Sequence, residues 1–290
     1  LEMYFDTNAD GLFMRTSGEW TEAKLDYFQR YVDMFLTAMR SSKLKWRSLN
    51  FVDLFSGPGK CRIKNSKKVI LGSPLLALTH GKYKFDNYFF SDTDEKTIEA
   101  LKARCESADH RNSIISYYCE DGNIAVEKIV KKLQEIDKEP LPYIWSSVNL
   151  AFLDPEGLEL RWSTIEKLAK VRRMDLIIYF SQMGINREMP NEIDLPSPTK
   201  LDFLFGGPEW RDIYRKNCNP STRRKEIHDL YRQKLSNLGY LDIREAEPVI
   251  RNKTHNAPLY CLFFASKNEL GNDFWQKVIH RDVYGQSRLF

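Results

Sequence analysis

The sequence predicts an α/β protein in which helices cover both faces of a mostly parallel, doubly wound sheet. Short apolar runs typical of buried strands alternate with amphipathic segments from residue 49 to residue 180. This alternation is typical of parallel sheets with helical crossovers. The first run ends in Asp53 and a turn that contains Gly57 and Gly59, and acidic residues follow the next three runs. Open sheets of this kind bind ligands at the carboxyl ends of their strands.

The composition is that of a folded protein, with 290 residues, 42% hydrophobic and 13% aromatic. No apolar stretch approaches the roughly 20 residues of a membrane helix, and no secretion signal is visible near the start. We therefore expect a cytoplasmic protein without a membrane partner. The five cysteines are scattered, form no CxxC pair and indicate reduced thiols, and the five histidines are equally dispersed. We expect no metal site. The net charge of +4 is only weakly in favour of a polyanionic partner.

The first predicted element is an amphipathic helix over residues 17–39. Its apolar residues recur every three or four positions and form one stripe, which consists of Leu25, Phe28, Val32, Phe35 and Met39. We expect this helix to pack on the sheet, within an N-terminal helical element of residues 1–48.

Five strands follow, and the α/β domain that they predict covers residues 49–185 and 237–290. The expected strands are 49–55, 87–91, 113–119, 148–153 and 174–180. Ser73 and Pro74 begin the first helix of the domain, as N-cap and first helical residue. Further helices are expected over residues 94–106, 124–136 and 163–171.

The pattern changes after the fifth strand. Residues 186–236 begin with a Pro-rich stretch (Pro190, Pro196, Pro198 and Pro208) and continue with two helical segments, around 210–216 and 222–235. We interpret them as a helical insertion. Two apolar runs, 241–250 and 258–265, predict an antiparallel C-terminal hairpin at the edge of the sheet. A short helix is expected over residues 274–279.

Four acidic residues lie at or near the ends of four successive strands: Asp53, Asp92, Asp121 and Asp154. In a parallel sheet these ends border one crevice. Each acid alone is explained equally well as a helix N-cap or a turn residue. The ordered set favours a ligand site.

The ligand that suits this set is S-adenosylmethionine. The turn with Phe55, Gly57 and Gly59 would let the backbone pass beneath the cofactor, because glycine has no Cβ to block a close approach. Asp53 would lie near the amino-acid end of the cofactor. Asp92 suits the ribose, because one carboxylate accepts hydrogen bonds from two adjacent hydroxyls.

Asp121, followed by Gly122, would accept a hydrogen bond from the adenine amino group. A dinucleotide site is the nearest alternative, and its GxGxxG fingerprint leads directly into a helix. Here the third glycine is missing after Gly57 and Gly59, and a polar stretch, residues 60–69, precedes the next helix. Both departures favour S-adenosylmethionine.

Asp154 and Pro155 occupy the place where methyltransferases of exocyclic amines carry Asp-Pro-Pro-aromatic. In those enzymes the aspartate and a backbone carbonyl orient the amine, and the aromatic ring stacks on a base that has left its stack. Glu156 and Gly157 replace the last two residues here, so the stacking partner is missing. A strand-ending turn is the alternative interpretation.

Basic residues follow the fifth strand and the insertion. Arg187 would contact a phosphate or carboxylate of the substrate, or pair with a neighbouring acid. Arg223, Arg224 and Lys225 form the densest basic region. They are candidates for a nucleic-acid surface, and a solvated helix face is the alternative.

Four segments together make the sequence resemble the three-Cys-motif partner proteins. These segments are residues 51–59 (Phe-Val-Asp-Leu-Phe-Ser-Gly-Pro-Gly), 72–75 (Gly-Ser-Pro-Leu), 152–157 (Phe-Leu-Asp-Pro-Glu-Gly) and 263–266 (Phe-Phe-Ala-Ser) with Gly271, Phe274 and Trp275. The resemblance runs over nearly all of residues 19–280. It implies a class I methyltransferase-like, Rossmann-like fold. It also implies a partner chain, the radical S-adenosylmethionine-like protein that carries the three-cysteine motif, and this chain itself has no three clustered cysteines.

We therefore expect S-adenosylmethionine-dependent methyl transfer, with DNA or RNA as the substrate and Asp154 and Pro155 at the catalytic position. The alternative is a non-catalytic partner or nucleic-acid-binding subunit that keeps the fold, as Glu156 and Gly157 suggest. A magnesium-dependent nuclease is less favoured, because carboxylates from three strands would have to converge on one ion.

Overall fold

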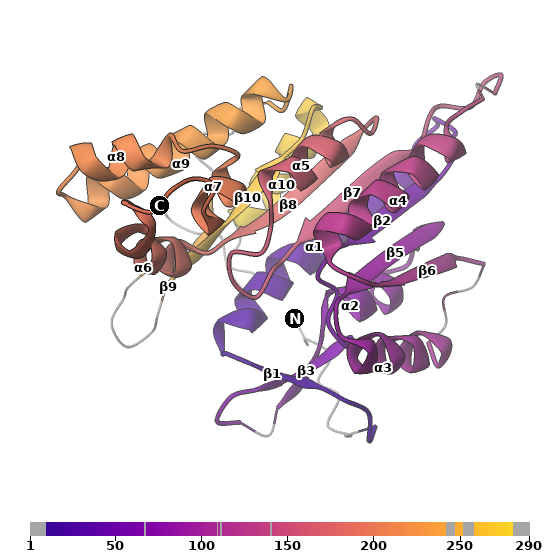
Figure 1. The fold of residues 1–290 in the computed structure, drawn as a ribbon. Coiled ribbons are helices and arrows are strands. Elements are labelled where there is room, and N and C mark those ends of the chain that lie inside the picture. Colours follow the sequence, from indigo (N-terminus) through magenta and orange to yellow (C-terminus); the bar gives the residue numbers. More distant parts are fainter. Residues whose placement is uncertain are drawn as a thin grey trace.

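The computed structural model describes residues 10–66, 68–108, 110, 112–139, 141–241, 247–251 and 258–280. They form a seven-stranded sheet with helices on both faces and a separate three-stranded sheet below it (Figure 1). The strands of the large sheet are β2 (Leu49–Asp53), β5 (Asn87–Asp92), β6 (Ile114–Cys119), β7 (Val148–Leu153), β8 (Met174–Phe180), β9 (Val249–Arg251) and β10 (Pro258–Ala265).

The strand order of the large sheet is β6-β5-β2-β7-β8-β10-β9. The first five strands are parallel, and β10 runs antiparallel to both β8 and β9. The chain winds outward from β2 to β6 and then returns to β7, so the topological switch point lies between β2 and β7. This confirms the predicted doubly wound, class I methyltransferase-like fold with an antiparallel C-terminal hairpin.

Four helices cover one face of the sheet: α1 (Trp20–Ser41), α2 (Ser73–Thr79), α3 (Glu95–Glu106) and α10 (Glu269–Ile279). The expected apolar stripe of α1 packs on this face. Phe28 lies 4.4 Å from Phe152 and 5.6 Å from Phe51 between ring centroids. The helix begins three residues after the predicted start and ends two residues after the predicted end.

Six helices belong to the other side: α4 (Gly122–Ile136), α5 (Trp162–Ala169), α6 (Gln182–Glu192), α7 (Lys200–Phe205), α8 (Trp210–Lys216) and α9 (Pro220–Asn237). The predicted helical insertion, residues 186–236, shares a hydrophobic core with the sheet, because Trp210 and Tyr231 are fully buried beside sheet residues. One segment differs from expectation: the Pro-rich start of the insertion was not expected to be helical, but helix α6 continues through Pro190.

The small sheet consists of β1 (Arg15–Ser17), β3 (Lys60–Ile63) and β4 (Val69–Leu71). It contains the polar stretch that follows the glycine turn. Strands β3 and β4 are antiparallel, and β1 adds parallel to β3. Sequence reasoning missed these strands, because their few apolar residues are interrupted by basic and polar ones.

The C-terminal hairpin is shorter than the predicted runs. Strand β9 covers only the end of the expected 241–250 run, and residues 242–246 of that run lie outside the described residues. Within the described ranges, none of the helices is both long and apolar enough to cross a membrane.

Candidate active site at the switch point

The turn after β2 opens the crevice at the switch point. Gly57 and Gly59 have φ angles of +62° and +83°, in the left-handed region that favours glycine. A Cβ on Gly59 would lie 3.0 Å from Leu101 and 3.1 Å from Leu75, whereas a Cβ on Gly57 would meet nothing within 4 Å. Gly59 thus lets the turn pack closely on α2 and α3, and Gly57 leaves open space for a ligand against the backbone.

Asp53 lies beneath this turn and is fully buried. One carboxylate oxygen accepts the Phe55 N–H at 3.2 Å, and the other accepts the Ser73 hydroxyl at 2.6 Å. Burial raises the pKa of Asp53 to about 7, and the nearby carboxylates of Asp154 and Asp92 raise it in the same direction. Asp53 therefore holds the turn against α2 and is about half ionised at neutral pH. Its predicted place near the cofactor's amino-acid end stays a prediction.

Asp92, at the end of β5, is 6% exposed and has partners on both oxygens. Oδ2 accepts the Gly57 N–H at 3.1 Å, and Oδ1 accepts a hydrogen bond from the Arg15 guanidinium at 2.9 Å. Arg15, on β1, also pairs with Glu156 at 2.9 Å. Arg15 therefore bridges the carboxyl ends of β5 and β7.

Asp154, directly after β7, pairs with Lys24 of α1. The Lys24 ammonium lies 2.7 Å from one carboxylate oxygen and 2.5 Å from the other, and 4.9 Å from the centroid of the Tyr179 ring. Pro155 is buried behind it. Both acids that the sequence places at the switch point are thus paired with cations from the N-terminal segment.

Several of these side chains border a cleft of about 120 Å³, and neither Asp53 nor Asp92 is among the residues that line it in the described structure. Its lining includes residues of the N-terminal segment, the glycine turn and the Asp-Pro turn: Arg15, Lys24, Phe55, Gly57, Gly59, Asp154, Pro155 and Glu156. Small-molecule sites usually enclose about 300 Å³ or more. The cleft, into which Arg15 and Lys24 project, is smaller than that.

Sequence reasoning missed Arg15 and Lys24. Arg15 belongs to a three-residue strand without an apolar pattern. Lys24 lies on α1, where the only pattern used for prediction was the apolar stripe, and it is not one of the stripe residues. The available signal was indirect. Acids gathered at strand ends require either cationic ligands or cationic side chains, because unpaired buried charge is costly.

Asp121 is the N-cap of α4. Its Oδ1 accepts both the backbone N–H and the side-chain amide of Asn123 at 2.8 Å. Gly122 packs under β2, where a Cβ would lie 2.4 Å from the Leu54 carbonyl oxygen. Neither residue is among those that line the cleft in the described structure, and their contact with adenine stays a prediction.

The four basic residues predicted to contact nucleic acid are also absent from the cleft lining that the described residues form. Arg187, on α6, is exposed and pairs with Glu188. Arg223, on α9, lies over the Tyr214 ring at 4.4 Å, Arg224 is half-buried, and Lys225 is exposed. The structure does not bring these side chains to Asp154, so their role in substrate binding stays a prediction.

No protein-family model matches the chain, and no curated protein matches it in sequence. Solved structures with a similar arrangement include a Legionella pneumophila protein with a TM-score of 0.45 and 11% identity, over 93% of this chain and 91% of that chain. Trm1 from Pyrococcus horikoshii, solved with S-adenosyl-L-methionine, has a TM-score of 0.44 and 9% identity, over 88% of this chain and 57% of that chain. Magnesium protoporphyrin IX methyltransferase from Synechocystis has a TM-score of 0.39 and 11% identity, over 92% of this chain and 88% of that chain. Likeness at this level carries no information on ligand or substrate.

Proposed function

We propose that this chain is an S-adenosylmethionine-dependent methyltransferase that acts on an amino group of a nucleic acid. The observation that carries the proposal is the gathering of the Gly57 turn, the Asp92 carboxylate and the Asp154 carboxylate at the switch point of a class I methyltransferase-like sheet. Ligands of doubly wound sheets bind at this point.

The residues present fit the cofactor. The open space over Gly57 admits a ligand against the backbone, and Asp92 can accept hydrogen bonds from a ribose diol. Three carboxylates (Asp92, Asp154 and Glu156) and three cations (Arg15, Lys24 and Lys60) lie in or beside the cleft, and Lys60 also pairs with Asp10. A carboxylate released from its cation would attract a positively charged sulfonium. When bound, S-adenosylmethionine supplies an electrophilic methyl group.

The chain's own residues would then orient the acceptor. Asp154 accepts a hydrogen bond from the target amine and directs the nitrogen lone pair toward the methyl group, while Lys24 fixes the position of the carboxylate. Arg15 leaves Asp92 when the ribose binds, because both use Oδ1 and the cleft is narrow while Arg15 occupies it.

Calorimetric titration with S-adenosylmethionine and S-adenosylhomocysteine tests the cofactor, and transfer of a labelled methyl group to DNA and RNA tests the reaction. We expect binding of both ligands. Asp154→Asn should keep the binding and lower transfer about 100-fold or more, as loss of an orienting polar group typically does. Glu127→Gln, on the exposed face of α4, is the control. Absence of binding at millimolar ligand would refute the proposal.

The same ion pairs favour a second candidate function, a non-catalytic subunit that binds the three-Cys-motif protein. Arg15 and Lys24 neutralise the acids that a cofactor would use, and Glu156 stands where a stacking motif would continue. Co-purification with that partner, equally strong for the wild type and for Asp154→Ala, together with no cofactor binding, would support this candidate. Loss of co-purification in Asp154→Ala would count against it.

A further inference from the structure

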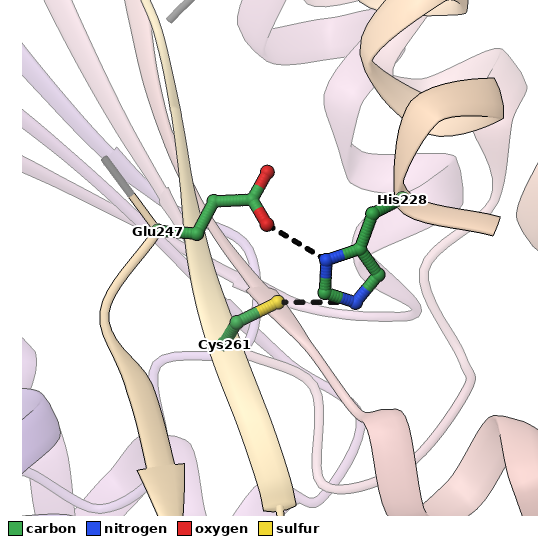
Figure 2. A group of neighbouring side chains, drawn as sticks. All are labelled: His228, Glu247 and Cys261. Atoms are coloured by element: carbon green, nitrogen blue, oxygen red, sulfur yellow. Dashed lines mark hydrogen bonds and ion pairs between the residues drawn. The ribbon is translucent and has the colours of Figure 1, made fainter. Parts of the chain in front are cut away.

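A histidine, a glutamate and a cysteine meet at the edge of the sheet, outside the cleft (Figure 2). His228 projects from α9, Glu247 precedes β9, and Cys261 lies on β10. One potential ligand atom of each lies within 4.8 Å of the others. His228 Nδ1 is 2.8 Å from Glu247 Oε2, and His228 Nε2 is 3.9 Å from Cys261 Sγ.

These separations are close to those of a metal site. Zinc bonds of about 2.0–2.3 Å in tetrahedral geometry hold ligand atoms about 3.5 Å apart. The three ligand atoms, which lie within 4.8 Å of one another, would have to reach this separation to bind one ion. Imidazole nitrogen, carboxylate oxygen and thiolate sulfur are also all zinc ligands, and the mixture disfavours magnesium and calcium, which prefer oxygen alone.

The surroundings orient two of the three side chains. Arg232 donates to Glu247 Oε1 at 2.8 Å, which leaves Oε2 directed at the imidazole. Gln182 places its carbonyl oxygen 2.7 Å from His228 Nε2, and its amide donates to Asn186 at 3.0 Å, which fixes the orientation of the amide. Histidines that bind metals usually donate their other ring N–H to such an oxygen. Nδ1, which is hydrogen-bonded to Glu247 Oε2, is then the ring atom that would bind a metal after losing its proton.

The cluster is enclosed by apolar rings. The His228 imidazole lies 5.4 Å from the centroids of both Phe180 and Phe263. Cys261 is 1% exposed and His228 is 8% exposed. A buried ion at this position would stabilise the fold and not meet a substrate.

We propose that His228 Nδ1, Glu247 Oε2 and Cys261 Sγ bind a zinc ion that fastens α9 to the sheet edge. On binding, the Cys261 thiol and the His228 Nδ1–H each lose a proton to solvent, and their lone pairs and that of the carboxylate form bonds to Zn²⁺. Nothing is oxidised or reduced. The thiolate and the carboxylate balance the two charges of the ion, and three protein ligands leave a fourth position for water.

The ion would join parts of the chain that are far apart in sequence. Cys261 is 33 residues from His228, and Glu247 is 19 residues from it. This spacing explains why no metal motif was visible in the sequence, where zinc sites are recognised by ligands only a few residues apart. The ion would also cross-link the helical insertion to β10, because His228 lies on α9 and Cys261 on β10.

Cobalt titration of the full chain, stripped with EDTA, tests the site. We expect one equivalent of Co²⁺ to produce a thiolate-to-cobalt absorption band in the near ultraviolet and d–d bands in the visible, and Zn²⁺ to remove both. Cys261→Ser and His228→Gln should lose the ultraviolet band. Cys105→Ser, which changes another fully buried cysteine, on α3, is the matched control and should keep it. A wild-type chain without the band, or a band that persists in Cys261→Ser, overturns the proposal.

Thermal unfolding gives a second measurement, and its wild-type arm does not depend on whether any variant folds. The wild-type chain and Cys105→Ser should gain melting temperature with Zn²⁺ and not with Mg²⁺, because an ion that binds only the folded state stabilises it. Glu247→Gln, which keeps the shape of the side chain, should lose most of the gain. An unchanged melting temperature of the wild-type chain at a saturating excess of Zn²⁺ contradicts the site.

Discussion

The two ends of the parallel sheet each hold a buried aspartate, and the two aspartates differ in what surrounds them. Burial raises the pKa of Asp53, at the carboxyl end of β2, to about 7 and that of Asp175, near the amino end of β8, to about 6. Asp175 accepts the Tyr31 hydroxyl at 2.9 Å and a hydrogen bond from Ser266. Both aspartates accept a hydroxyl hydrogen bond, and only Asp53 also has further carboxylates nearby, those of Asp154 and Asp92. A raised pKa therefore marks burial at both ends but a charged site at only one.

The cavities at the two ends differ in the opposite direction. The amino end has a cavity of about 400 Å³ lined largely by apolar and aromatic side chains, such as Phe35 and Trp46, and the carboxyl-end cleft is about 120 Å³. Cavity volume alone would favour the amino end as the ligand site. The glycine turn and the acidic residues favour the carboxyl end. Arg15 and Lys24 are among the side chains that line the smaller cleft.

The largest expected effect is on stability at the carboxyl end. The unfolded pKa of Asp53 is 3.8 and the folded pKa about 7, so the folded chain binds more protons between these values and the free energy of unfolding falls as pH rises from 4 to 7. About three pKa units correspond to about 4 kcal/mol at most. Asp53→Asn, which cannot ionise, should therefore be more stable than the wild type at pH 8 by up to about 4 kcal/mol, with little difference at pH 3.

Urea unfolding at pH 5, 6.5 and 8 measures this difference. A variant whose stability relative to the wild type is the same at all three values would show that Asp53 titrates normally. The same variant should bind S-adenosylmethionine about tenfold more weakly at pH 8, because it has lost a negative charge beneath the sulfonium.

Asp175→Asn should show the same sign with a smaller amplitude. Its folded pKa of about 6 lies about two units above the unfolded value of 3.8, which gives up to about 3 kcal/mol at pH 8. The stability of the wild type relative to this variant should fall between pH 4 and 6 and then stay level. Cofactor affinity should be unchanged, and a loss equal to that of Asp53→Asn would remove the distinction between the two ends.

The next prediction concerns Arg15, whose guanidinium pairs with Asp92 beside the cleft. Arg15→Ala should raise the affinity for S-adenosylmethionine about tenfold, or about 1.4 kcal/mol, because Asp92 no longer has to exchange a guanidinium for a ribose. Stability should change by less than about 1 kcal/mol, because the Arg15 side chain is 28% exposed and such pairs contribute little. Arg62→Ala, at the exposed position of β3 beside β1, is the control. Weaker binding by Arg15→Ala would instead make Arg15 a cofactor ligand.

The alternation of strands and helices between residues 49 and 180 and the acids at the strand ends could be predicted from sequence, because both depend on local patterns. Period and length identify a buried strand, and parallel pairing carries the ends of β2, β5 and β7 to one side. Which way each carboxylate points could not be predicted, because it depends on tertiary partners such as the Ser73 hydroxyl beside Asp53.

The contacts that decide the site's charge could not be predicted. Lys24 and Asp154 are 130 residues apart, and Arg15 and Asp92 are 77 apart. Neither pair shares a periodic pattern, because each forms only when α1 and β1 pack on the finished sheet. The same holds for His228 and Cys261 at the other edge. Tertiary packing, and not local propensity, brings these groups together.

The smallest expected effect separates the two roles of Asp121. Both described hydrogen bonds of its carboxylate use Oδ1, so Oδ2 is the oxygen left to accept from an adenine amino group. Asp121→Asn keeps an N-cap of equal quality but places an amide that cannot accept where Oδ2 was. We expect its unfolding free energy to stay within about 0.5 kcal/mol of the wild type, while the affinity for S-adenosylmethionine falls about fivefold, or about 1 kcal/mol. Asp121→Ala should lose about 1 kcal/mol of stability as well, through the missing cap. Calorimetric titration and urea unfolding on both variants separate the two losses, and an Asp121→Asn variant with wild-type affinity would reduce Asp121 to a helix cap and confine the ligand-binding acids to the strands that border the switch point.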